Sequence, residues 1–382
     1  MHYHEYVRFT EMGIFFSFIA FMIKPILSPY IKSLGFDELQ VCLIFSVFTL
    51  TIIFLSPIIG KISDNVGRKT MILFGVVMNI LAMIFYIIDG SWIFLVAARI
   101  FNAIGYITVA LIILSKIEDS VDGKTRGKYT GWTLSLENIA KIASPVAGGV
   151  LADMFFIRAP FYMSIFLLLI FMGYLIKQKP KRKAKIKRCD FNVIEELKEF
   201  LSERKLKGLA LLGMTVYASI PAIYLFLPLF IVEKFGLTYT YVGVAYFFFG
   251  FFNLFQFYFG EISDKMGRSK MLIFGTSIYG FGLILLSISQ SYPMLLLVLI
   301  LQGLGGSMWN ISTYCIMSEA GEKLKKEAQT LMSYESLARM GAFFSFILSG
   351  FVVTIFNIES LFVLDGVLIL IISLYTVKYI ID

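Results

Sequence analysis

The fold of this chain is decided by a polar segment that occurs twice. Residues 60–69 read GKISDNVGRK, and two hundred residues later residues 260–270 read GEISDKMGRSK. Each copy ends one long apolar run and opens another, which continues as MILFG at 71–75 and as MLIFG at 271–275. Self-similarity at a fixed spacing in an apolar chain indicates two copies of one helical membrane unit.

The composition identifies lipid as the main solvent of the protein. Of the 382 residues, 58% are hydrophobic and 16% are charged, whereas soluble globular chains contain about 25% charged residues. Runs long enough to cross a bilayer as helices occupy residues 10–31, 39–60, 71–88, 92–115, 129–152, 159–177, 208–232, 238–259, 271–289, 293–317, 328–354 and 359–379. The sequence therefore predicts an all-α integral membrane protein with twelve transmembrane helices in two pseudo-symmetric six-helix bundles, at 1–177 and 208–382.

Lysine and arginine residues indicate the topology. With the N-terminus inside, 27 of the 34 lie in inner loops or tails, and the outer loops hold Lys32, Arg158 and Lys234. Because inner loops of membrane proteins have an excess of these residues, we expect both termini to be cytoplasmic. The predicted location is the plasma or inner membrane, crossed many times.

Residues 178–207 are predicted to form a cytoplasmic linker between the two bundles. The basic run at 177–188 lies directly between two spans, so we expect it to contact anionic lipid and not nucleic acid. After this run in the sequence, apolar residues recur at helical spacing, which predicts a short amphipathic helix on the inner membrane face. These residues are Phe191, Ile194, Leu197 and Leu201.

The twelve spans, the inner central linker and the Gly-x-x-x-Asp-x-x-Gly-Arg-Lys segment between spans two and three resemble the major facilitator superfamily. The resemblance extends over essentially the whole chain, and it implies a monomeric secondary transporter that works by alternating access. It also implies a gating role for both copies of the motif. The motif residues are Gly60, Asp64, Gly67 and Arg68, and Gly260, Asp264, Gly267 and Arg268.

Two further segments resemble motifs of this family. Arg99, Asn102 and Gly105 in span four resemble an arginine-containing motif linked to proton transfer, whereas the second half has Leu299 where the arginine would stand. In span five, Ser144-Pro145-Val-Ala-Gly148-Gly149 resembles a Gly-Pro-x-x-Gly-Gly motif associated with antiporters, with a serine replacing the first glycine. The alternative interpretation of span five is a proline-kinked helix that packs on its neighbour.

Two acid–base pairs lie inside predicted spans, where a charged side chain costs about 2.5–3.5 kcal/mol. Glu137 precedes Lys141 by four residues in span five, and Glu335 precedes Arg339 by four in span eleven. This spacing places both charges on one helix face. Three interpretations stay open: the pairs neutralise themselves and aid packing, one of the acids takes up a proton during a transport cycle, or the basic members contact an anionic substrate.

Other polar or aromatic side chains in the spans are candidates for a cavity that receives an amphipathic organic molecule. Together with the two basic members above, Lys141 and Arg339, they are Asn102, Tyr224, Asn253, Gln256, Trp309 and Asn310. Lys24 lies in the outer part of span one, so we expect its ammonium group to reach the outer interface.

The functional expectation is secondary transport. The most favoured reaction is proton-coupled efflux (antiport) of an amphipathic or cationic organic compound, because span five resembles an antiporter motif and Arg99, Glu137 and Glu335 can couple protons. The alternative is a uniporter or symporter for a sugar, an amino acid or an organic anion. A membrane enzyme or a non-transporting sensor is disfavoured. An enzyme gives no reason for two matched halves, whereas alternating access does. Three scattered cysteines and two N-terminal histidines indicate no metal site, and we expect no cofactor.

Overall fold

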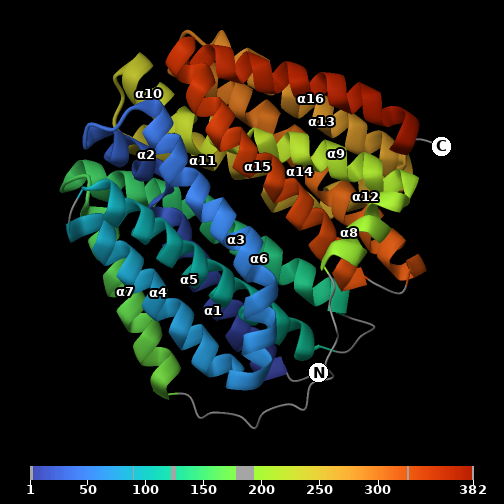
Figure 1. The fold of residues 1–382 in the computed structure, drawn as a ribbon, viewed down its shortest axis with the longest axis horizontal. Coiled ribbons are helices and arrows are strands. Elements are labelled where there is room, and N and C mark those ends of the chain that lie inside the picture. The colour runs from blue at the N-terminus through green and yellow to red at the C-terminus, as the bar shows by residue number, and fades with distance from the viewer. Residues whose placement is uncertain (1–2, 89, 122–125, 178–192, 325–326, 381–382) are drawn as a thin grey trace. The chain divides into compact units, whose positions relative to one another are not determined.

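The computed structural model describes residues 3–88, 90–121, 126–177, 193–324 and 327–380, and every regular element in these ranges is a helix. In chain order they are α1 (Tyr3–Met22), α2 (Lys24–Ser33), α3 (Glu38–Val66), α4 (Arg68–Ile88), α5 (Trp92–Asp119), α6 (Arg126–Met154), α7 (Ala159–Lys177), α8 (Val193–Ser202), α9 (Arg204–Ala218), η1 (Ala222–Phe226), α10 (Leu227–Phe235), α11 (Tyr239–Gly250), η2 (Phe251–Phe255), α12 (Gln256–Met266), α13 (Arg268–Ser287), α14 (Tyr292–Leu324), α15 (Glu327–Ile355) and α16 (Ile358–Ile380). Figure 1 shows them as a ribbon.

Three of the predicted spans are interrupted helices. Span one is α1 followed by α2, with Pro25 just after the break. Span seven is α9 and α10 joined by the π-helical turn η1, which Pro221 precedes. Span eight is α11 and α12 joined by the 3₁₀ turn η2. Proline removes a helical hydrogen bond, and π or 3₁₀ turns inside a long helix often mark functional positions.

The described residues contain eleven helical segments long and apolar enough to cross a membrane. The long helix α6 is not among them, although it occupies the predicted fifth span. Its middle holds Glu137, Asn138 and Lys141, and these side chains lower its hydropathy. The predicted all-helical membrane fold is therefore confirmed, and α6 is its polar span.

The helices pack into two compact units. Unit 1 comprises Met1–Asp37, Val47–Arg188 and Gly236–Phe247, and unit 2 comprises Glu38–Ser46, Cys189–Phe235 and Phe248–Asp382. The first segment of α3 thus packs in unit 2 and most of α11 packs in unit 1.

The same helix pairings recur in both units. In unit 1, α4 packs on α5 and α7, and α1 packs on α6 and α7. In unit 2, α13 packs on α14 and α16, and α9 packs on α15 and α16 (Figure 1). The repeat in the sequence therefore corresponds to a repeated packing scheme.

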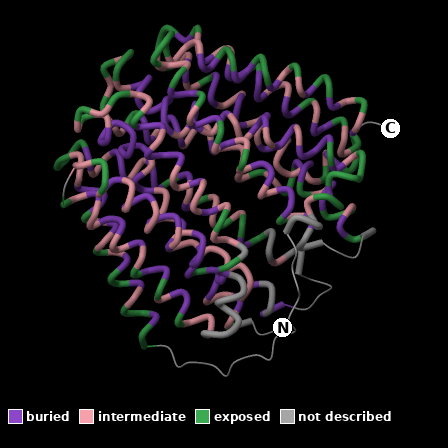
Figure 2. Tube along the Cα trace, viewed as in Figure 1, coloured by how far each residue is buried: buried purple, intermediate pink, exposed green. Residues whose placement is uncertain are grey.

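Large apolar side chains are exposed along the outer helices of each unit. Figure 2 shows exposed residues recurring along α7 and α16. Phe166 and Ile170 are exposed on α7, and Leu368 and Leu374 are exposed on α16. Extended apolar surfaces of this kind mark contact with lipid.

The helix α8 lies within the segment predicted to be an amphipathic linker helix, and the predicted Leu197 packs against a cluster of buried residues. Phe200, absent from the prediction, is buried in a cluster with Leu206 and Leu209 of α9, whereas the predicted Leu201 is 40% exposed. Leu197 and Phe200, rather than Leu201, therefore form the packed face of α8, which contacts α9 and α15. The basic run at 178–188 lies outside the described residues, as do Phe191 and the side chain of Ile194.

Pairs of glycines form close helix contacts, and these pairs also repeat. A Cβ atom on Gly105 of α5 would lie 2.6 Å from the carbonyl oxygen of Gly75 in α4. A Cβ atom on Gly305 of α14 would lie 2.6 Å from the carbonyl oxygen of Gly275 in α13. Both crossings therefore require glycine, which lets helix backbones approach each other in lipid.

A valine at these glycines is expected to destabilise the protein. Gly105→Val and Gly305→Val should each lower the free energy of unfolding by about 1–3 kcal/mol, because the new side chain overlaps the facing backbone. The control is Gly173→Val in α7, where a Cβ would meet no atom within 4 Å. Thermal unfolding of the detergent-purified protein measures the effect, and an unchanged unfolding temperature for Gly105→Val would contradict the described crossing.

Candidate functional site

Glu137 and Lys141 form an ion pair on one face of α6 in unit 1. The Lys141 Nζ lies 3.1 Å from Glu137 Oε2, as the spacing of four predicts. The hydroxyl of Ser17 in α1 donates a hydrogen bond of 3.3 Å to the same carboxylate oxygen. Gly13 gives the carboxylate its space, since a Cβ there would lie 2.5 Å from Oε1. Glu137 is thus held between its own helix and α1.

Lys24 and Lys141 lie against the same aromatic ring. The Lys24 Nζ is 3.5 Å from the ring centroid of Phe21, and the Lys141 Nζ is 5.9 Å from it. We predicted that Lys24 reaches the outer interface; its ammonium packs over the ring of Phe21, which precedes it in the chain. Arg99 of α5 is buried with its guanidinium carbon 4.6 Å from the ring centroid of Phe48.

Glu335 of α15 occupies the corresponding place in unit 2, with different partners. The hydroxyl of Tyr217 in α9 donates to both carboxylate oxygens, at 3.0 and 3.1 Å, and the hydroxyl of Tyr314 in α14 lies 3.3 Å from Oε1. Arg339 Nη2 lies 3.3 Å from Oε2. Trp309 contacts the Tyr217 ring edge-to-face, with centroids 6.1 Å apart. We call Tyr217, Trp309, Tyr314 and Glu335 the Glu335 cluster.

The two acids therefore share a geometry and differ in surroundings. In each unit a hydroxyl from the first long helix, Ser17 or Tyr217, donates to the acid. Both acids are half-buried: the Glu137 side chain is 15% exposed and the Glu335 side chain is 24% exposed. A carboxylate with several donors and some access to solvent can bind a cation or exchange a proton.

Asn102 lies at a helix crossing. Its Nδ2 donates a hydrogen bond of 3.1 Å to Asn79 Oδ1, and Asn79 Nδ2 donates one of 2.9 Å to the Gly75 carbonyl. Asn102 is buried in the contact between α5 and α4. The Asn102 amide therefore links α5 to α4. Leu95 and Arg99, at helical spacing from Asn102 on α5, are also buried.

The remaining cavity candidates lie on η1, η2, α12 and α14 of unit 2. Asn253, within η2, accepts hydrogen bonds from Ser307 Oγ at 2.8 Å and from Gln256 Nε2 at 3.2 Å. Tyr224 lies in the π turn η1. Like Tyr224, Trp309 and Asn310 of α14 are half-buried. The hydrogen bond from Ser307 of α14 to Asn253 thus links the 3₁₀ turn η2 to α14.

The repeated motif forms a tight turn and an ion network. Gly67 and Gly267 have φ of 100° and 94°, values that favour glycine at these two turns. In the second copy, Arg268 lies 3.1 Å from Asp264 and 2.5 Å from Glu319 of α14, and it donates to the Cys315 carbonyl at 3.2 Å. The side chain of Asp64 and the surroundings of Gly60 lie outside the described part of the first copy. Arg68 is half-buried at the start of α4.

The Ser144–Gly149 segment packs backbone against backbone. A Cβ on Gly148 would overlap the carbonyl of Met22, and one on Gly149 would overlap the carbonyl of Tyr239. From the other side, a Cβ on Gly243 of α11 would overlap the carbonyl of Pro145, and Ser144 is fully buried. These small residues let α6 touch the α1–α2 break and α11 at once.

Asp153, which the sequence reading missed, binds the start of α11. Its carboxylate accepts hydrogen bonds from Thr238 Oγ1 at 2.6 Å, from the Tyr239 amide at 3.0 Å and from the Thr240 amide at 2.8 Å. Burial by itself raises the pKa of Asp153, but the hydrogen bonds from Thr238, Thr240 and Tyr239 outweigh it and lower this pKa below its ordinary value. The acid is a helix cap.

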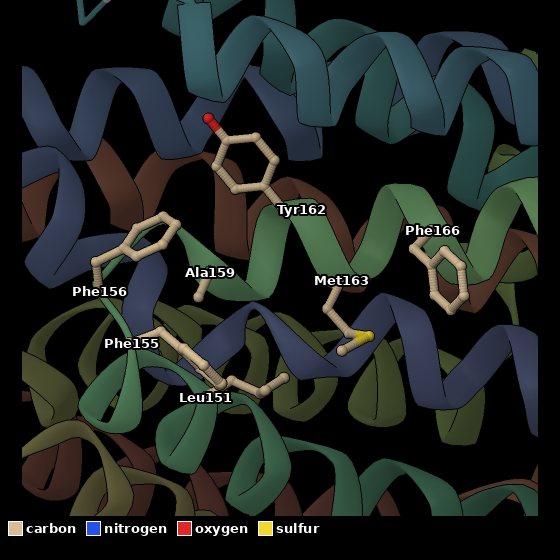
Figure 3. Close-up of a pocket in the computed structure, with 7 residues that line it drawn as sticks. All are labelled: Leu151, Phe155, Phe156, Ala159, Tyr162, Met163 and Phe166. Atoms are coloured by element: carbon tan, nitrogen blue, oxygen red, sulfur yellow. The ribbon is translucent and has the colours of Figure 1, made fainter.

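An apolar hollow of about 260 Å³ lies at the junction of α6 and α7. Figure 3 shows its lining residues, Leu151, Phe155, Phe156, Ala159, Tyr162, Met163 and Phe166. None of them is a predicted site residue, and Phe155, Phe156, Tyr162 and Phe166 are exposed. The hollow belongs to the apolar outer surface and not to the candidate site.

Comparison with known families decides the identity of the chain. The Major Facilitator Superfamily model matches residues 12–255 and 209–382. The chain belongs to the major facilitator superfamily. An uncharacterized MFS-type transporter of Methanocaldococcus jannaschii is 27% identical over 367 residues, which is 92% of each chain. The quinolone resistance protein NorA of Staphylococcus aureus is 24% identical over 173 residues, 44% of each chain.

Solved structures of transporters share the fold of this superfamily member. The nucleoside transporter NupG superposes with a TM-score of 0.80 at 14% identity, covering 97% of this chain and 99% of that one. A POT family transporter bound to a thioalcohol-conjugated peptide gives 0.77 at 15% identity, covering 98% and 94%. The protein is thus a multi-pass membrane transporter and not an enzyme.

Removing the Asp153 cap is expected to destabilise the protein at neutral pH. Asp153→Ala should lower the free energy of unfolding by about 1 kcal/mol near pH 7. Since the folded-state pKa lies below the unfolded value of about 3.9, this stabilisation is present above that pH and is lost as pH falls through the folded-state pKa. Thermal unfolding of wild type and variant should therefore converge on acidification.

Glu203→Ala is the matched control, because Glu203 precedes α9 without making a side-chain cap hydrogen bond. It should leave the unfolding temperature nearly unchanged. An Asp153→Ala protein as stable as wild type near pH 7 would contradict the capping role.

Proposed function

We propose that this protein exports an amphipathic or cationic organic compound in exchange for protons. The Glu335 cluster is the observation on which the proposal rests. The hydroxyls of Tyr217 and Tyr314 are directed at one half-buried carboxylate there, and Trp309 packs edge-to-face on the Tyr217 ring. Aromatic faces and a carboxylate together attract organic cations.

Exchange follows if the cation and the proton compete for Glu335. A protonated carboxyl group no longer attracts a cation, so proton uptake favours release of the compound. The same proton also weakens the ion pair with Arg339, 3.3 Å away. Glu335 thereby links the protonation state to the charge that the site presents, which is the requirement for antiport.

Glu137 and Arg99 have supporting roles in this proposal. Glu137 is a second proton acceptor, because it too is paired, half-buried and bound by a hydroxyl. Arg99 supplies fixed positive charge in unit 1, and Arg339 and Lys141 neutralise the acids between protonation events. Tyr224, Asn253, Gln256, Trp309 and Asn310 contribute amide and aromatic contacts for the transported molecule.

The repeated motif and the Ser144–Gly149 segment serve the conformational change in this proposal. Arg268 joins Asp264 to Glu319, and breaking such an exposed network costs little because water screens it. Gly60, Asp64, Gly67 and Arg68 are the matching residues of the first copy. Efflux agrees with the similarity to the quinolone resistance protein. We further propose that the protein works as a monomer in the cell membrane. Its two six-helix bundles would be residues 1–177 and 208–382, joined by the linker 178–207.

Neutralising Glu335 is expected to uncouple transport from protons. Glu335→Gln should reduce extrusion of a cationic dye driven by a pH gradient at least about tenfold, because the charge on the acceptor is lost. Dye movement in proteoliposomes, with and without an imposed gradient, measures this. Glu137→Gln is the matched variant, and we expect it to retain more activity because the hydroxyl that donates to Glu137 comes from Ser17 rather than from a tyrosine.

Tyr217→Phe preserves the ring but removes the hydroxyl that donates to Glu335. It should change the pH dependence of extrusion, because the carboxylate loses a hydrogen-bond donor. An unchanged pH dependence in both Glu335→Gln and Tyr217→Phe would exclude Glu335 as the coupling residue.

The proposed topology places both termini in the cytoplasm. A fluorescent protein that matures only in the cytoplasm should be bright when fused to either end of the chain. Alkaline phosphatase, active only outside, should be inactive at both ends and active when inserted after Lys234, in a predicted outer loop. Opposite results at the two ends would contradict an even number of spans.

A further inference from the structure

We propose that Lys24 and Lys141 form a subsite for a carboxylate group on the exported compound. The inference rests on the proposed function and adds a chemical requirement to its substrate. An amphipathic molecule recognised here would have an anionic group in addition to its apolar body. The subsite lies wholly within unit 1, on α2, α6 and the end of α1.

The first support is the placement of two ammonium groups at one ring. Lys24 Nζ lies 3.5 Å and Lys141 Nζ lies 5.9 Å from the centroid of Phe21. The two groups come from different helices, α2 and α6, and still converge on this ring. Both lysines are half-buried, and the Lys141 side chain is 24% exposed.

Helix packing brings the two lysines together. Gly148 contacts the carbonyl of Met22, two residues before Lys24, and α2 packs on α6. This contact seats α6 at the break between α1 and α2, and Lys141 lies about two turns before Gly148 on the same helix. Breaks in transmembrane helices are positions where transporters of this architecture bind their substrates.

Electrostatics favour an anion at this place. Lys24 lies within electrostatic reach of both Lys141 and Arg99, and like charges at close range repel one another strongly where water is scarce. A carboxylate between the two ammonium groups reverses that repulsion and forms charge-assisted hydrogen bonds. Glu137 Oε2 lies 3.1 Å from Lys141 Nζ and holds the lysine in position.

A pair of dyes that differ only in one carboxyl group tests the subsite. Rhodamine B has a free carboxylate, and its ethyl ester does not. Fluorescence polarisation with the full-length protein, purified in a neutral detergent, gives the dissociation constant for each. Lys24→Gln and Lys141→Gln should each weaken binding of the carboxylate dye about tenfold, while changing the affinity for the ester by less than about twofold.

Two kinds of control accompany these variants. Lys32→Gln neutralises a lysine in the last turn of α2 and should leave both affinities unchanged. Lys24→Arg and Lys141→Arg keep the positive charge and should retain most of the affinity for the carboxylate dye, which a purely structural defect would not allow. Unfolding temperatures identify any variant that fails to fold. Where a glutamine variant does not fold, the affinity of the arginine variant for the two dyes tests the role of that lysine.

Equal losses for both dyes in the glutamine variants would overturn the subsite. So would an affinity that depends on added anionic lipid and not on the carboxyl group of the dye. Because binding is measured without transport, a carboxylate preference lost in Lys24→Gln supports the subsite even where no dye is exported. If the wild-type protein extrudes the ester but binds the acid no more tightly, the subsite is wrong and the proposed export function still stands. If it binds neither dye, the result contradicts both proposals.

Discussion

Close contact between helix backbones is the constraint on which this structure depends. Lipid gives helices no hydrophobic reason to associate, so backbone approach must supply van der Waals contact. Gly75 with Gly105, and Gly275 with Gly305, provide that contact in the two units. A third contact, Gly148 with the Met22 carbonyl, seats α6 against the break in the first span. Along the same two helices, Glu137 of α6 accepts a hydrogen bond from Ser17 of α1 and pairs with Lys141.

The two units use one packing scheme to hold different chemistry. The fifth long helix of unit 1 presents Glu137 to a serine of α1, beside two lysines on Phe21. The corresponding helix of unit 2 presents Glu335 to two tyrosines and has Trp309 close by. Since the surroundings of a carboxylate decide whether it binds a proton or a cation, duplicated helices provide two distinct sets of groups.

Much of this arrangement was predictable from local patterns. The i,i+4 spacing of Glu137–Lys141 and Glu335–Arg339 predicted side chains that meet, and they do. The small residues of 144–149 predicted close packing. Asp153 escaped notice because its partners at 238–240 are far away in the sequence. Phe200 was missed because the orientation of α8 depends on α9 and α15 rather than on its own pattern.

The sequence by itself determined the solvent, the helical class, the repeat and the superfamily, because apolar length and motif spacing are properties of the chain alone. Only the tertiary structure decided which helices meet, and therefore what each charge contacts. Lys24 shows the difference: its place in the chain suggested a side chain that reaches outward, whereas packing of α6 at the break between α1 and α2 brings Lys141 to the same ring. Contacts between distant segments depend on the shapes of both partners, which no local pattern specifies.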